Sequence, residues 1–168
     1  MAKKNKKNGY LFFGGVILIL GLMYLIFFTS PQAQLKEVKL YFSYNQAQNL
    51  KAEVREVKTD KLYKNTIREL IKGPSKEDLG RTIPEGTELI NLELEEDILT
   101  LNFNSNFRKN HWGGSTGEIM TIYSIVNTMC QFSEVDQVLF LLEGEQVESL
   151  VGHVSLNEPV SSNNKLIK

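Results

Sequence analysis

The sequence is poor in the residue types that build covalent frameworks and metal sites. It contains one cysteine, Cys130, and two histidines, His111 and His153, among 168 residues. A lone cysteine excludes an intrachain disulfide framework, so the folded part must be held together by packing. The chain has no H-x-x-x-H spacing, no C-x-x-C spacing and no calcium-loop pattern. We therefore expect no metal ion and no cofactor.

Charge is absent between residues 9 and 28, where the sequence reads GYLFFGGVILILGLMYLIFF. As a helix that rises about 1.5 Å per residue, this run reaches the roughly 30 Å of a bilayer's hydrocarbon core. Four lysines lie within residues 1–8 and no acidic residue precedes Glu37, which predicts a cytoplasmic N-terminus. The sequence thus predicts a cytoplasmic segment 1–8, a transmembrane anchor 9–28, a linker 29–37 and an extracytoplasmic remainder.

A cleaved signal peptide is the alternative, because basic residues followed by an apolar run serve both purposes. The run is longer than the roughly 7–15 apolar residues of a signal peptide. Residues 29–33, TSPQA, offer no clean small-x-small cleavage site. An uncleaved anchor, and hence a single-pass protein of the cell membrane, is the favoured interpretation.

Basic residues are outnumbered after the anchor. All 20 acidic residues lie beyond residue 28, against 15 of the 19 basic residues, which gives the exported part a formal charge of −5. Such a surface presents no attractive field to the phosphates of nucleic acid. We therefore expect neither nucleic acid nor anionic lipid as a partner of this surface.

The apolar residues of the exported part alternate between strand and helix spacing. Helical spacing occurs at 62–72, ended by Gly73 and Pro74, and again at about 116–132. Strand spacing predicts two first strands, a hairpin, an inner strand and an edge strand, at 38–44, 51–58, 90–103, 138–142 and 147–155. These elements predict an α+β domain over 38–160 with two layers, both helices packed on one face of a mostly antiparallel sheet. Residues 161–168 are expected to form a flexible tail.

Residues 113–117, GGSTG, match the G-x-S-x-G pattern of many hydrolase nucleophiles. That pattern requires the serine on a sharp turn directly between a strand and a helix. Here the preceding strand ends near Asn104, about ten residues before Ser115. Ser115, Asp136 and His153 follow the chain order of α/β-hydrolases, but the exported part is too short for that fold. No catalytic residue is predicted; a small cell-wall hydrolase or ligand-binding module that uses Ser115 and His153 is the alternative.

Ser115 and Glu118 have a structural interpretation as well. The spacing S-x-x-E is that of a capping box, in which the serine oxygen and the glutamate satisfy N–H groups at the start of a helix. We therefore predict Ser115 and Glu118 as the cap of the second helix. Trp112 and His111 precede this cap in a loop, and His153 is expected at the sheet edge. Because tryptophan is enriched at interface hot spots, these three residues are the candidate interaction residues.

Taken in order, these elements resemble the GerMN domain family of sporulation and spore germination. The matching stretches are LIKGP at 70–74, IPEGT at 83–87, GGS at 113–115 with Glu118, Thr128 with Phe132, Val135 and Val138, Glu143-Gly144, and Gly152-His153 with Pro159. The resemblance implies a non-enzymatic domain that works outside the cytoplasmic membrane. It also implies a fold similar to the ring-building motifs of secretion machines. The partners implied are envelope proteins of a sporulation or germination assembly, with self-association as an option.

Overall fold

The computed structural model describes residue 15, residues 19–24 and residues 34–168 of the chain. Residues 34–168 form a compact unit of their own. The predicted segments 1–8, 9–28 and 29–37 lie largely outside the described residues. Residues 15 and 19–24 are helical, and no helix within the described ranges is long and apolar enough to cross a membrane.

The first sheet is built on a long antiparallel hairpin of β1 (Leu35–Tyr44) and β2 (Asn49–Lys58). Both predicted strands are confirmed, and β1 starts within the predicted linker, at Leu35. The short strand β3 (Leu79–Gly80) pairs with the end of β1 on its other side, at Ser43 and Tyr44. The order in this sheet is β2-β1-β3.

The second sheet contains the predicted hairpin, β4 (Leu89–Glu95) and β5 (Ile98–Phe103), and the predicted inner strand, β6 (Gln137–Leu142). Strand β6 runs parallel to β5, because the chain crosses over through two helices before it returns. The edge strand predicted at 147–155 is wrong, since these residues form an irregular loop. The short strands β7 (Glu145–Gln146) and β8 (Val160–Ser161) pair with β6 instead.

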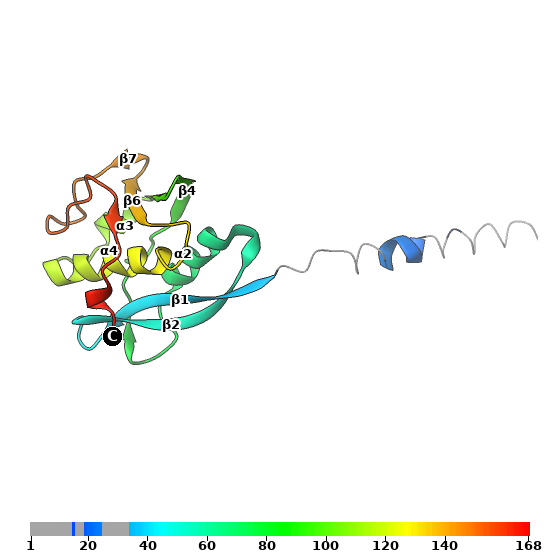
Figure 1. The fold of residues 1–168 in the computed structure, drawn as a ribbon, viewed down its shortest axis with the longest axis horizontal. Helices are drawn as coiled ribbons and strands as arrows, with labels where there is room; N and C mark the ends of the chain where they lie inside the picture. The colour runs from blue at the N-terminus through cyan, green and yellow to red at the C-terminus, as the bar shows by residue number, and fades with distance from the viewer. Residues whose placement is uncertain (1–14, 16–18, 25–33) are drawn as a thin grey trace, which may run out of the picture. The chain divides into compact units, whose positions relative to one another are not determined.

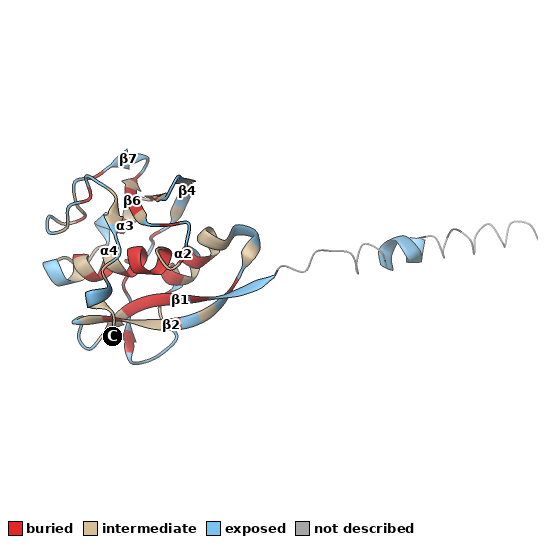
Figure 2. Cartoon of the chain, viewed as in Figure 1, coloured by how far each residue is buried: buried red, intermediate tan, exposed pale blue. Residues whose placement is uncertain are grey.

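Two long helices lie between the two sheets (Figure 1). Helix α2 (Leu62–Lys72) follows a turn of 3₁₀ helix, η1 (Thr59–Lys61), and helix α4 (Ser115–Met129) follows the single turn α3 (Asn106–Lys109). The α+β class is confirmed, but the two-layer arrangement with one sheet is wrong. Helix α4 contacts both β1 and β6, and most of its length is buried (Figure 2).

The second buried face of α4 is polar, which explains why the spacing of apolar residues failed to predict it. The Ser124 hydroxyl donates to the Tyr41 carbonyl at 2.6 Å, and the Tyr41 N–H donates to the Thr128 hydroxyl at 3.1 Å. In the turn after the helix, the Gln131 side-chain amide accepts from the N–H of Lys39 and donates to its carbonyl, both at 2.8 Å. Helix α4 thus covers the β1 edge that β3 leaves open, and it satisfies backbone groups that a neighbouring strand would otherwise pair.

The C-terminal residues pack against the first sheet, so the flexible tail predicted at 161–168 is wrong. The side chain of Asn127 bonds both the N–H and the carbonyl of Asn163, at 2.8 and 3.2 Å. A turn of 3₁₀ helix, η2 (Asn164–Leu166), follows, and Ile167 then forms a bridge with Leu50. Leu166 and Ile167 pack against the buried Leu50, and burial of these apolar side chains holds the end of the chain in place.

Candidate interaction site at the start of helix α4

Trp112 stands half exposed beside the first turn of α4. Its exposed fraction is 51%, the highest of any aromatic residue within residues 34–168. A Cβ atom added to Gly117 would lie 2.7 Å from the indole Nε1 and 2.9 Å from Cδ1. The indole therefore lies directly against the helix at a position where only glycine leaves room. The ring of His111 stacks on it, with centroids 5.1 Å apart and an interplanar angle of 23°.

His111 is fixed by hydrogen bonds at both ring nitrogens. Its Nδ1 accepts from the Gly113 N–H at 3.0 Å, and its Nε2 lies 3.2 Å from the Thr121 hydroxyl. The Thr121 hydroxyl donates to the Thr82 carbonyl at 2.7 Å, so Nε2 is assigned as the donor to Thr121 and the ring as neutral. Burial lowers the pKa of His111 and outweighs the opposing effect of Glu118. The neutral ring therefore forms a fixed support for the indole.

Glu118 follows Gly117 in the first turn of α4, and its exposed fraction is 0%. Its carboxylate accepts three backbone N–H groups from the loop 149–154. The donors are Leu150 at 2.7 Å, Val151 at 3.0 Å and His153 at 2.7 Å. Burial by itself raises the pKa of the Glu118 carboxyl, but the backbone donors of the loop together outweigh it and leave the pKa below its usual value. Glu118 thus carries a buried negative charge that ties the 149–154 loop to α4.

The predicted capping box is wrong. Helix α4 begins at Ser115, its N-cap is Gly114 with φ of 77°, and no side chain caps it. The Glu118 N–H donates to the Gly114 carbonyl at 3.1 Å, while the Glu118 carboxylate is engaged by the loop. A carboxylate that leaves water gains more from three converging N–H donors than from the single N–H that a capping box offers. Ser115 remains an exposed residue of the first turn.

The residues of the hydrolase alternative do not form a catalytic arrangement. His153 is exposed, and its backbone N–H is bound to Glu118. Within residues 34–168, no hydrogen bond joins Ser115 to His153 or His153 to Asp136. A shallow depression of about 410 Å³ is lined by His153, Ser149 and Asn157 but not by Ser115. Of the predicted interaction residues, Trp112 and His111 lie together at Gly117, and the backbone N–H of His153 is bound to the adjacent Glu118.

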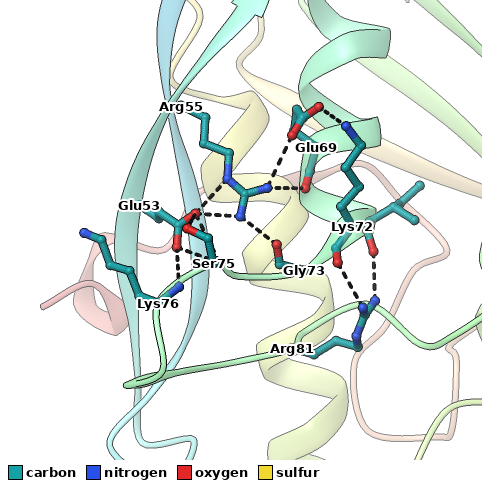
Figure 3. Close-up of polar contacts among 9 residues, drawn as sticks. Glu53, Arg55, Glu69, Lys72, Gly73, Ser75, Lys76 and Arg81 are labelled. Atoms are coloured by element: carbon teal, nitrogen blue, oxygen red, sulfur yellow. Dashed lines mark hydrogen bonds and ion pairs between the residues drawn. The ribbon is translucent and has the colours of Figure 1, made fainter.

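A second buried carboxylate, which the sequence did not identify as special, lies at the other long helix (Figure 3). Glu53 on β2 has an exposed fraction of 2%. It accepts the N–H of Ser75 at 3.0 Å, the hydroxyl of Ser75 at 2.9 Å and the N–H of Lys76 at 3.2 Å. It also pairs with Arg55, whose Nε lies 2.7 Å from the carboxylate. The available signal was the pair of opposite charges at alternate positions of one strand, which places both on the same face.

Two arginines complete this site by bonding the carbonyl groups at the end of α2 (Figure 3). Arg55 donates to the carbonyls of Glu69 and Gly73, at 3.1 and 2.7 Å. Arg81 donates to the carbonyls of Ile71 and Lys72, at 2.8 and 2.9 Å. These carbonyls lack partners within the helix. The positive charges of the two arginines also interact favourably with the partial negative charge at the C-terminal end of the helix dipole. The site fixes the 73–76 loop, and the Glu53 carboxylate and the Arg55 guanidinium are both engaged in doing so.

Solved structures with a similar fold come from two bacteria. A protein from Clostridium perfringens classed as a lipoprotein is 27% identical, with a TM-score of 0.57, over 77% of this chain and 89% of the other. The tandem GerMN domains of the sporulation protein GerM from Bacillus subtilis give a TM-score of 0.63 at 19% identity, over 83% of this chain and 51% of theirs. The first of those domains alone gives 0.58 at 17% identity, over 76% and 97%.

A comparison with curated protein sequences finds no match. The family model described as Germane, sporulation and spore germination, matches residues 39–148. That range includes both long helices, most of both sheets and the candidate interaction residues Trp112 and His111, whereas β8 and His153 lie beyond it. The family is a sporulation domain family and not a known enzyme family. The resemblance to GerMN domains is thereby confirmed, and this chain belongs to the Germane family of sporulation and spore germination domains.

Proposed function

We propose that this protein is a membrane-anchored, extracytoplasmic interaction domain of a sporulation or germination assembly, and that it is not a catalyst. The observation that carries the proposal is the use of the Glu118 carboxylate. This buried acid lies one helical turn after Ser115 and is bound to the backbone of His153, and its oxygens accept three backbone N–H groups. A general base needs a free proton acceptor within reach of its substrate, and Glu118 is neither free nor exposed.

The binding surface that we propose is centred on Trp112. A half-exposed indole is well suited to anchor a contact, because it offers a large apolar area with a polar N–H at its edge. His111, Gly117 and the α4 backbone hold this indole in position, so little side-chain entropy remains to be lost on binding. His153 and the rest of the 149–154 loop form the adjoining part of the surface.

Anchoring through residues 9–28 belongs to the same proposal. It is supported by the uncharged run and by the lysines that precede it. The lipoprotein classification of the Clostridium perfringens protein is compatible with attachment of such domains to a membrane. The exported domain then meets its partner in the envelope. That partner is another envelope protein of the assembly or a further copy of this chain.

Crosslinking of the full-length protein in sporulating cells tests the proposal. Trp112→Ala is compared with Val54→Ala, because both side chains are more than half exposed but lie on different parts of the domain. We expect the wild type and Val54→Ala to give a crosslinked envelope partner and Trp112→Ala to lose it. The mass of the product tells a second copy from another protein. Recovery of monomer alone from wild-type cells, at normal expression, would contradict the proposal.

A further inference from the structure

Strand β4 has a free edge. It pairs with β5 on one side and is the outermost strand of the second sheet, whose order is β4-β5-β6-β7. Within residues 34–168, no strand pairs with its other side. This contrasts with β1, where α4 side chains bond the edge. A seven-residue strand with an open edge is able to accept an added strand, because its outward N–H and carbonyl groups are not paired with another strand.

A groove with a partly apolar lining lies beside residues 90–92 of this strand. The pairing register shifts between Leu89 and Asn91, and Ile90 at this irregularity is 46% exposed. Ile90 and Leu92 form one wall of a groove of about 520 Å³. The opposite wall comes from residues 59–64, where Leu62 and Tyr63 lie among the polar residues Asp60, Lys61 and Lys64. The bulge therefore turns an aliphatic side chain toward solvent beside an open strand edge.

The same hairpin is uniformly acidic. Residues 82–107 contain six acidic residues and no basic one. Glu93 and Glu95 lie on the exposed face of β4, and Glu96 and Asp97 form its turn. None of these four carboxylates takes part in an ion pair within residues 34–168. Two copies joined edge to edge through β4 would bring these charges together, which opposes self-pairing.

We propose that the free edge of β4 binds an extended segment of a partner protein in which basic and apolar side chains alternate. Backbone hydrogen bonds to β4 would add the segment as a new strand of the sheet. Because successive side chains of a strand point to opposite faces, the apolar ones enter the groove beside Ile90 and Leu92. The basic ones then lie over Glu93 and Glu95. This inference rests on the proposed function only in taking the domain to be a binding module.

Synthetic peptides test the assignment on the full-length protein in nanodiscs of phosphatidylcholine, a lipid without net charge. The probe is a ten-residue peptide of alternating Lys and Val. One control peptide carries N-methyl groups on every amide, so that it keeps the charge and the side chains but has no N–H group left to pair with a strand edge. A second control alternates Glu and Val. We expect the probe to bind at least tenfold more tightly than either control and to slow hydrogen exchange at residues 89–95.

Protein variants locate the binding. The double variant Glu93→Lys/Glu95→Lys reverses charge on β4, and Glu145→Lys/Glu148→Lys makes the same change on exposed residues elsewhere. We expect the first to weaken probe binding at least tenfold and the second to change it less than twofold. Ile90→Ser tests the groove and should weaken binding about threefold. Salt should weaken binding as well, because the charges involved are exposed.

Three results would overturn the inference: equal binding of the methylated probe, unchanged binding by the β4 double variant, or slowed exchange at 89–95 that depends on protein concentration without peptide. The last would assign the edge to a second copy. Trp112→Ala is expected to leave probe binding unchanged. If the probe fails while Trp112-dependent crosslinking persists in cells, the β4 assignment alone is refuted; the reverse pattern refutes the Trp112 surface.

Discussion

Two buried glutamates hold two loops in this domain, and they do so with different partners. Glu53 accepts two backbone N–H groups and a hydroxyl from residues 75 and 76, and it pairs with the Arg55 guanidinium. Glu118 accepts three backbone N–H groups from the 149–154 loop, and no ion pair involves it within residues 34–168. The 73–76 loop is thus held by hydrogen bonds to a carboxylate that is also part of an ion pair. The 149–154 loop is held by backbone N–H hydrogen bonds to a carboxylate without a cation.

The difference matters because the two loops are not equally supported. The 73–76 loop is also fixed through Arg55 and Arg81, which bond the carbonyls at the end of α2. The 149–154 loop has fewer supports: Arg108 bonds the Ser149 carbonyl, and the Ser149 hydroxyl bonds the Gly152 N–H. Leu150 anchors the 149–154 loop in the core, but its polar contacts depend mainly on one carboxylate, whereas those of the 73–76 loop are shared among several groups.

Removal of the Glu118 carboxylate should give the largest loss of stability. Glu118→Ala leaves three N–H groups without an acceptor and a cavity in the first turn of α4, so we expect a cost of about 3 kcal/mol in the free energy of unfolding. Glu118→Gln keeps one acceptor oxygen and should cost about half as much. Trp112, the only tryptophan of the chain, gives the fluorescence signal for denaturant unfolding. Equal stability of Glu118→Ala and wild type would contradict this role.

Removal of Arg55 should cost somewhat less. Arg55→Met leaves the Glu53 charge buried without a cation, but Ser75 and Lys76 still donate to it, so we expect about 2 kcal/mol. The double variant Glu53→Met/Arg55→Met should recover part of that loss, since no uncompensated charge remains. The same unfolding measurement gives the coupling energy between the two positions. If the double variant merely adds the two single losses, Glu53 and Arg55 do not act as a pair.

Some elements and contacts of this domain could be predicted from the sequence, and others could not. The spacing of apolar residues predicted the β1–β2 hairpin, the β4–β5 hairpin, β6 and both long helices, because each of these patterns is local. The role of Glu118 could not be predicted, since the N–H groups that bind it come from residues 32 to 35 positions later. The Glu53–Arg55 pair left a signal in the alternate charges of one strand, but that signal was not used. A capping box is a local rule, and here donors distant in sequence prevailed over it.

The position of α4 between two sheets was missed for a related reason. Its second face carries Thr121, Ser124 and Thr128, which the apolar pattern treats as solvent-facing. They are buried because the open edge of β1 and the Thr82 carbonyl give each of them a hydrogen-bonding partner. Of the candidate site, Trp112 and His111 were identified by residue type and loop context. Their support by Gly117 becomes visible only once the indole and the helix are seen in contact.

Gly117→Ala should displace the Trp112 indole with little change in the stability of the fold. The added Cβ would lie 2.7 Å from Nε1, so Trp112 must move, while alanine favours the helix by up to about 1 kcal/mol. We expect a change in stability below about 1 kcal/mol together with a shifted Trp112 emission maximum and loss of the crosslinked partner. Thr116→Ala, one residue away and exposed, is the matched control. An unchanged emission maximum would mean that the indole does not lie on Gly117.

Acid should weaken the Trp112 region before it weakens the rest. The pKa of His111 is lower in the folded state than in the unfolded chain, where it is about 6.5. Just below pH 6.5, His111 is therefore protonated in the unfolded chain while it is still neutral in the folded chain. The free energy of unfolding should therefore fall as the pH drops through this range. Because His111 binds at most one proton, its contribution to this slope stays below about 1.4 kcal/mol per pH unit. Unfolding at pH 7.5 and 6.0 measures it, and His111→Gln should flatten it. The pKa of Glu118 is lowered too, so its contribution is present above the unfolded value and is lost further into acid.

Ser115→Ala should have the smallest effect. Ser115 is exposed and makes no capping bond, so we expect a change below about 0.5 kcal/mol and unchanged crosslinking in cells. A loss near 1 kcal/mol would restore the capping role. Loss of function at unchanged stability would favour the hydrolase alternative, in which this hydroxyl is the nucleophile.

Amide hydrogen exchange in wild type and Glu118→Gln tests the central claim most directly, namely that Glu118 serves the 149–154 loop beside Trp112. We expect the amides of Leu150, Val151 and His153 to exchange faster in the variant while the Ser115 amide keeps its rate. Faster exchange at Ser115, with the three loop amides unchanged, would contradict the account.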